Sequence, residues 1–135
     1  QEYRIGTYIF NDRSLVENKI CSEKKVALTV LATVVSTPTK NRAIIDAGSK
    51  VLTSDLFGMN DHGSIVNFPE LRITQLTEEH GTIMSEQNTN LKIGQKIQII
   101  PNHACVVTNM LNEVNLITEE KKIKKVKVIA RGKVW

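Results

Sequence analysis

Aromatic residues and cysteines are both scarce in this sequence. Phenylalanine, tyrosine and tryptophan make up 4% of its 135 residues, and its two cysteines are Cys21 and Cys105. Single-strand nucleic-acid binders usually stack bases on aromatic rings, so this composition disfavours that class. Two cysteines do not make a disulfide scaffold, and we therefore expect reduced thiols in a cytoplasmic protein.

Long apolar runs and recognisable leader segments are also missing. No run approaches the roughly 18 apolar residues of a membrane-spanning helix, so we expect no membrane partner. Residues 1–4 show no basic region followed by an apolar one, as a signal peptide would. Because the chain begins with Gln1 rather than methionine, we expect either a processed start or the back part of a longer protein.

The composition that remains is that of one globular domain covering residues 1–135. Hydrophobic residues make up 41% and charged residues 24% of the chain. Short segments rich in β-branched residues, separated by turn residues, predict a mainly β fold: an antiparallel barrel or sandwich with one or two short helices. The expected strands are 26–37, 42–47, 71–77, 81–85, 95–100, 113–118 and 123–130. Asn11 or Asp12 is a candidate cap for a short helix reaching about Asn18.

Positive charge is concentrated near the end of the chain. The net charge is +4, and residues 121–133 carry seven lysines or arginines and no acid. These alternate with apolar residues such as Ile123 and Val126, which favours a strand with its lysines in water. A basic module that contacts nucleic acid is the alternative interpretation.

The segment 101–105 (PNHAC) has the strongest chemical potential. In extended chain, His103 and Cys105 would point to one face and offer zinc an imidazole nitrogen and a thiolate. If a helix begins at His103, the two side chains diverge. Two ligands are an incomplete site, and a buried cysteine beside a hydrogen-bonded histidine is the structural alternative.

Three other side chains could take part in chemistry. His80 is a candidate third ligand or general base, although a hydrogen-bonded histidine at a strand start explains it equally. Lys50 is expected to be exposed or ion-paired rather than a Schiff-base lysine. His62, in the predicted exposed loop 58–63, is expected to be solvated.

Six segments taken together resemble the C-terminal domain of the D-serine dehydratase / D-threonine aldolase family. This family comprises fold-type III pyridoxal-phosphate enzymes related to alanine racemase. The segments occur in the same order: 4–12 (RIGTYIFND), 45–50 (IDAGSK), 78–81 (EEHG), 91–94 (LKIG), 101–105 (PNHAC) and 130–132 (ARG). The resemblance covers essentially the whole chain.

The resemblance implies a set of site residues and cofactors. His103 and Cys105 match the family's zinc ligands and would bring zinc to the substrate's β-hydroxyl, and Tyr8 lies near where family members contact the substrate. Pyridoxal phosphate would be bound by an N-terminal barrel that is absent from this chain, together with its Schiff-base lysine. The chain alone is therefore expected to be inactive, with His80 as its candidate catalytic residue.

The implied function is that of a lyase acting on a small β-hydroxy D-amino acid. A thiolate ligand favours zinc and hence the D-serine dehydratase branch, and D-threonine aldolase is the alternative. The expected partners are the barrel of the same protein and, in the full-length enzyme, a second subunit of a homodimer. Two non-catalytic readings remain: a stand-alone basic β-barrel that binds nucleic acid or a ligand, and a domain kept for oligomerisation.

Overall fold

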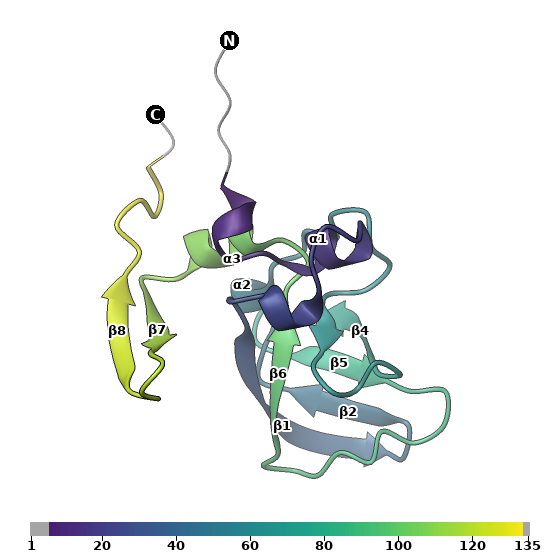
Figure 1. Cartoon of the computed structure of the whole chain (residues 1–135). Helices are drawn as coiled ribbons and strands as arrows, with labels where there is room; N and C mark the ends of the chain where they lie inside the picture. Colours follow the sequence, from purple (N-terminus) through teal and green to yellow (C-terminus); the bar gives the residue numbers. More distant parts are fainter. Residues whose placement is uncertain (1–5, 134–135) are drawn as a thin grey trace.

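The computed structural model describes residues 6–133, and most of its strands form a closed barrel (Figure 1). The barrel order is β1-β2-β5-β4-β3-β6, and every neighbouring pair is antiparallel. The barrel strands are β1 (Val30–Thr39), β2 (Arg42–Ile45), β3 (Ser64–Ile65), β4 (Arg72–Leu76), β5 (Gly81–Met84) and β6 (Lys96–Ile100).

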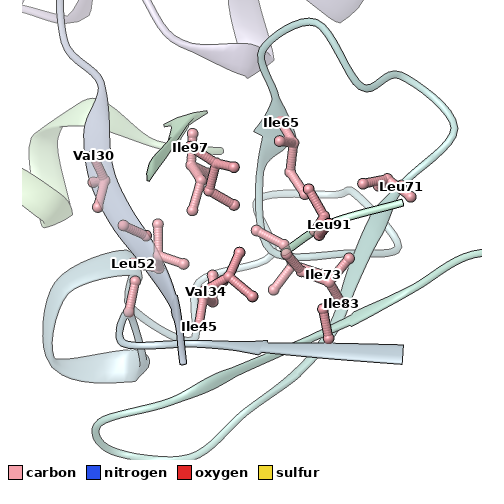
Figure 2. Close-up of a cluster of buried hydrophobic side chains, with 14 of the residues drawn as sticks. Val30, Val34, Ile45, Leu52, Ile65, Leu71, Ile73, Ile83, Leu91 and Ile97 are labelled. Carbon is pink, nitrogen blue, oxygen red and sulfur yellow. The ribbon is translucent and has the colours of Figure 1, made fainter. Parts of the chain in front are cut away.

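Alternation of side chains along these strands builds the core inside the barrel. On β1, Val30, Ala32 and Val34 are buried and Leu31 and Val35 face outward, as the two-residue period of a strand requires. Isoleucines from the other strands meet them in the interior (Figure 2). The side chains that are essentially inaccessible to solvent include Ile45, Ile73, Ile83 and Ile99.

Short helices lie at one end of the barrel. They are α1 (Arg13–Glu17), α2 (Ser49–Leu52) and α3 (Ala104–Met110), with 3₁₀ turns η1 (Thr7–Ile9) and η2 (Glu23–Lys25). Asp12 is the N-cap of α1 and its side chain accepts a hydrogen bond from the Leu15 N–H, and Asn18 is the C-cap. The predicted cap and helix are therefore confirmed. No helix in the described range 6–133 is long and apolar enough to cross a membrane.

A two-stranded hairpin follows α3 and stands apart from the barrel (Figure 1). It consists of β7 (Glu113–Ile117) and β8 (Ile123–Lys127). Every residue of β8 is exposed, so the clustered lysines lie in water as predicted. Lys125 pairs with Glu113 across the hairpin at 3.9 Å, and Lys122 pairs with Glu120 at 2.6 Å.

The predicted fold class is confirmed, and the differences concern element ends and short elements. The first strand begins at Val30 rather than residue 26, because the chain before it bonds elsewhere: the Ala27 N–H donates to the Phe10 carbonyl at 2.7 Å. The sequence did not predict β3 or α2. The loop 58–63 is a loop but not wholly exposed, because Asp61 and Gly63 are buried.

Candidate functional site

His103 is held on two sides by the loop 55–57. Its Nδ1 lies 3.0 Å from Oδ2 of Asp55, and this hydrogen bond lowers the pKa of the Asp55 carboxyl. The ring of Phe57 stacks on the imidazole with centroids 4.2 Å apart and planes inclined by 24°. The imidazole is thus oriented, with Nε2 as the nitrogen left for a ligand.

Cys105 lies two residues further on, in the first turn of α3. Its side chain is a free thiol on an exposed residue, and Sγ is 3.4 Å from Oγ1 of Thr7. Tyr8, the predicted substrate contact, follows Thr7 in η1 and is 63% exposed. The turn η1 therefore lies against the start of α3, and segments 98 residues apart meet there.

The helix begins just after His103, so the helical alternative weighed from the sequence is the one observed. His103 is the N-cap, with φ −139° and ψ 106°, and Cys105 is already in helical conformation. A buried carboxylate fixes the residue between them, because Oδ2 of Asp12 accepts the Ala104 N–H at 2.8 Å. The other oxygen of Asp12 accepts from the Ser14 hydroxyl and the Leu15 N–H. One side chain therefore ties α1 to the His103–Cys105 segment.

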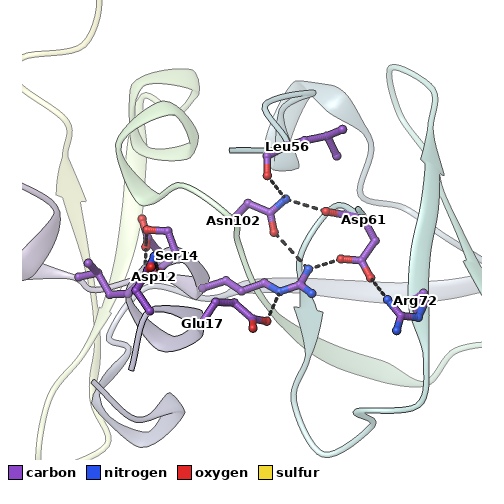
Figure 3. A network of polar contacts seen from close by, with 10 residues as sticks. Asp12, Ser14, Glu17, Leu56, Asp61, Arg72 and Asn102 are labelled. Atoms are coloured by element: carbon purple, nitrogen blue, oxygen red, sulfur yellow. Dashed lines mark hydrogen bonds and ion pairs between the residues drawn. The ribbon is translucent and has the colours of Figure 1, made fainter. Parts of the chain in front are cut away.

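The Asn102 side chain fixes the main chain on the other side of His103 (Figure 3). Its Nδ2 donates to the carbonyl oxygens of Leu56 and Asp61 at 3.2 and 2.7 Å, and its Oδ1 accepts from Arg13 at 3.3 Å. Arg13 also pairs with the buried carboxylate of Asp61. The bond to Leu56 holds the loop that carries Asp55 and Phe57 beside the His103 ring.

These contacts orient the His103 imidazole and tie the Cys105 thiol, two residues further along the chain, to η1. An imidazole nitrogen and a thiolate are donors that zinc prefers, and both side chains reach solvent in part. Within residues 6–133, no group of three or more His, Cys, Asp or Glu side chains could hold a metal ion. His103 and Cys105 would supply two ligands of a metal ion, and water, a substrate or groups outside the described residues would have to fill the other positions.

His80 makes no hydrogen bond or ion pair with His103 or Cys105 among the described residues. It is exposed in the β4–β5 turn, where its N–H donates to Oγ1 of Thr77 at 3.2 Å. The same turn packs against the start of α2: the Ser49 N–H donates to the Thr77 carbonyl, and Lys50 pairs with Glu79. The segments 45–50 and 78–81 are thus neighbours, and the expected ion-paired state of Lys50 is confirmed.

His62 corrects one expectation from the sequence. Its side chain is half-buried rather than solvated, and Nδ1 is buried without a hydrogen-bond partner among the described residues. Burial lowers the pKa of His62, and the neighbouring Asp61 carboxylate opposes this only in part. The loop turns inward at this point because the buried Asp61 bonds Arg13 and Arg72.

Comparison with known protein families identifies the family of this chain. Residues 27–117, more than half of the chain, match the family described as "Putative serine dehydratase domain". The chain belongs to the serine dehydratase domain family. The match runs from the approach to β1 through β7 and includes His103 and Cys105. The family resemblance predicted from the sequence is therefore confirmed. Residues 4–5 of its first segment lie outside the residues that the structure describes.

Relatives of this serine dehydratase domain come in two lengths. An uncharacterized protein of Mycobacterium tuberculosis is 34% identical over 131 residues, which is 93% of this chain and 98% of that protein. The D-serine dehydratase of Dictyostelium discoideum is 34% identical over 136 residues, covering 90% of this chain and 34% of the enzyme. The chain thus spans nearly all of the first relative and about a third of the second.

Solved structures share the fold over the same stretch. D-threonine aldolase from Filomicrobium marinum has a TM-score of 0.80 at 27% identity, covering 96% of this chain and 36% of the enzyme. A D-threo-3-hydroxyaspartate dehydratase, solved as a cysteine-to-alanine mutant "in the metal-free form", has a TM-score of 0.74 at 25% identity. It covers 90% of this chain, which spans 37% of that enzyme.

Sequence reasoning missed several residues that shape the site. Asp55 and Phe57 lie in an irregular loop and carry no pattern that would link them to His103. Thr7 and Asn102 fall within the segments 4–12 and 101–105, so the family resemblance marked their positions without assigning them a task. Asp12 was predicted as a helix cap, and its second bond to Ala104 is an addition from the structure.

Proposed function

We propose that this chain is the metal-bearing C-terminal domain of a lyase that acts on a β-hydroxy D-amino acid. Residues 1–135 form one domain, and His103 and Cys105 hold zinc at the helical end of the barrel. The observation that carries the proposal is the pair itself, an imidazole with Nδ1 engaged and a free thiol two residues away. The metal-free cysteine mutant of a related dehydratase supports a metal role for a cysteine in this family.

His103 and Cys105 would hold zinc, and the metal would supply Lewis acidity toward a substrate hydroxyl. The chain's own residues provide the position. His103 presents Nε2 because Asp55 engages Nδ1, and Asp12 and Asn102 fix the main chain on either side of the imidazole. Tyr8 is exposed and follows Thr7, the residue that contacts Cys105. It is the proposed substrate-binding side chain.

D-serine dehydratase is the activity we favour within this class. The thiolate is a soft ligand that suits zinc, and the Dictyostelium enzyme of that name is 34% identical over the domain. D-threonine aldolase is the alternative, supported by the likeness to the Filomicrobium enzyme. Coordination of a β-hydroxyl serves both reactions, so the choice between them lies with the rest of the enzyme.

The remaining parts of the proposal concern what lies outside this chain. Pyridoxal phosphate would bind to an N-terminal barrel, which would also supply the Schiff-base lysine and leave this domain inactive by itself. The named relatives are about three times longer than the region they share with this chain, which supports such a partner. A homodimeric full-length enzyme in the cytoplasm completes the proposal.

A stand-alone ligand- or metal-binding domain is the second candidate. It is favoured by the mycobacterial relative, because 98% of that protein aligns with this chain alone. Sequencing the reading frame upstream of Gln1 separates the candidates. A barrel-length segment there supports the lyase, to be assayed with D-serine and D-threonine, whereas a start codon just upstream supports the stand-alone domain.

Zinc titration of the chain against a competing chelator tests the metal site. His103→Ala and Cys105→Ala should each weaken zinc binding by at least about tenfold, since each removes half of the protein donors. His80→Ala and Cys21→Ala are the matched controls and should bind zinc like the unaltered chain. Equal zinc affinity in all five proteins would refute the proposed site.

A further inference from the structure

The orientation of the His103 ring depends on a carboxylate that comes from a separate loop. Oδ2 of Asp55 lies 3.0 Å from Nδ1 of His103, across 48 residues of sequence. Phe57 stacks on the ring, and Asn102 bonds the carbonyl of Leu56, between the two. The loop is therefore fixed to the residue that precedes His103, and the ring is clamped from its edge and its face.

A carboxylate next to one ring nitrogen decides which nitrogen carries the proton. A neutral imidazole has one N–H, and an ionised carboxylate can only accept. The proton is therefore placed on Nδ1, and the lone pair is left on Nε2. Histidines that bind metals in proteins are commonly fixed in this way by a second residue that does not touch the metal.

We propose that Asp55 is a positioning residue that holds His103 as the Nδ1–H tautomer, with Nε2 ready to bind zinc. This inference rests on the proposed function, because it assigns Asp55 a task at the metal site that His103 and Cys105 form. Asp55 acts through His103 and is not itself a zinc ligand.

A purely structural task for Asp55 is the competing explanation. Its Oδ1 accepts the Phe57 N–H at 3.0 Å and so shapes the loop. Asp55→Asn separates the two tasks, because an amide retains one oxygen for the Phe57 N–H. Its NH₂ group, however, replaces the oxygen that faces Nδ1. A donor there favours the Nε2–H tautomer, in which the zinc-binding lone pair is blocked.

The tautomer is measurable in the metal-free chain by long-range ¹H–¹⁵N correlation NMR of the histidine rings near pH 8. The His103 signals are assigned by their loss in His103→Ala. The unaltered chain should show the proton on Nδ1, and Asp55→Asn should shift it to Nε2. Asp46→Asn is the matched control, since Asp46 accepts a main-chain bond from Thr33 between β1 and β2. The Nε2–H tautomer in the unaltered chain would overturn the inference.

Zinc affinity provides the second readout. Asp55→Asn should weaken zinc binding by about 10- to 100-fold, the usual cost of losing such a partner, and Asp46→Asn should leave it unchanged. Zinc affinity within threefold of the unaltered chain in Asp55→Asn, combined with loss in His103→Ala, would overturn the role of Asp55 and leave the metal site intact. Unchanged affinity in His103→Ala would instead overturn the proposed function.

Discussion

The barrel and the β7–β8 hairpin are both antiparallel, yet they protect their strands differently. In the barrel, closure through the β1–β6 and β3–β6 pairs leaves every strand with two neighbours, and the enclosed side chains are buried. The hairpin has two free edges, and large apolar side chains such as Leu116 and Ile123 are exposed on it. A two-stranded hairpin alone is marginal in water, so its lysines serve to keep the edges from pairing with other chains.

The difference also explains where the candidate site lies. His103 and Cys105 come directly after β6 and are supported by α1 and the loop 55–57, all at the helical end of the barrel (Figure 1). Three of the side chains that fix the main chain around this segment are buried: Asp12, Asp61 and Asn102. A rigid base of this kind is suited to holding two donors in fixed geometry. The hairpin provides no comparable base.

Truncation of a core isoleucine should have the largest effect on stability. Ile83→Ala removes a fully buried side chain and should cost about 2–5 kcal/mol. The matched change on the hairpin, Leu116→Ala, alters a half-exposed residue and should stay within about 0.5 kcal/mol. Urea denaturation of both variants measures the contrast. An equal cost at the two positions would mean that the hairpin packs as part of the core.

His62, in the loop before β3, should make the stability of the chain depend on pH, with a smaller effect than the loss of a core isoleucine. Burial places the pKa of His62 below its usual value of 6.5 in the folded chain. Below pH 6.5 the unfolded chain therefore binds more protons at this residue than the folded chain, so stability falls as pH falls until the folded pKa is passed. Above that range His62 is neutral in both states and contributes no slope.

His62→Asn should remove this part of the pH dependence. The difference between the denaturant midpoints of His62→Asn and the unaltered chain should change as the pH falls from 8 to 5. The reason is that only the unaltered chain gains a proton at residue 62 on unfolding. His80→Asn is the control, since His80 is exposed. Parallel curves for His62→Asn and the unaltered chain would contradict the assignment.

Much of the barrel could be predicted from the sequence because its strands carry a local signal. The β-branched, alternating segments 42–47, 71–77 and 95–100 each became a strand with ends shifted by one or two residues. Strand β3 has two residues, too few for a period to be visible. Closure of the barrel depends on pairs such as Ser64 with Ile100, which no local pattern specifies.

The site was predictable to a smaller extent, and the reason is again distance along the chain. His103 and Cys105 could be named because they form one short segment that the family resemblance marks. Their supports come from residues 48 to 98 positions away, through Asp55, Asp12 and Thr7. Whether the segment was extended or helical could not be decided locally, and the bond from Ala104 to Asp12 lies at the start of the helix that was formed.

Cobalt(II) substitution tests the central claim most directly, because a thiolate bound to cobalt gives a charge-transfer absorption that other ligands do not. The chain loaded with one equivalent of cobalt(II) should show this band. The band should persist in Cys21→Ala and disappear in Cys105→Ala. A band that survives Cys105→Ala, or none in the unaltered chain, would contradict a metal site built on His103 and Cys105.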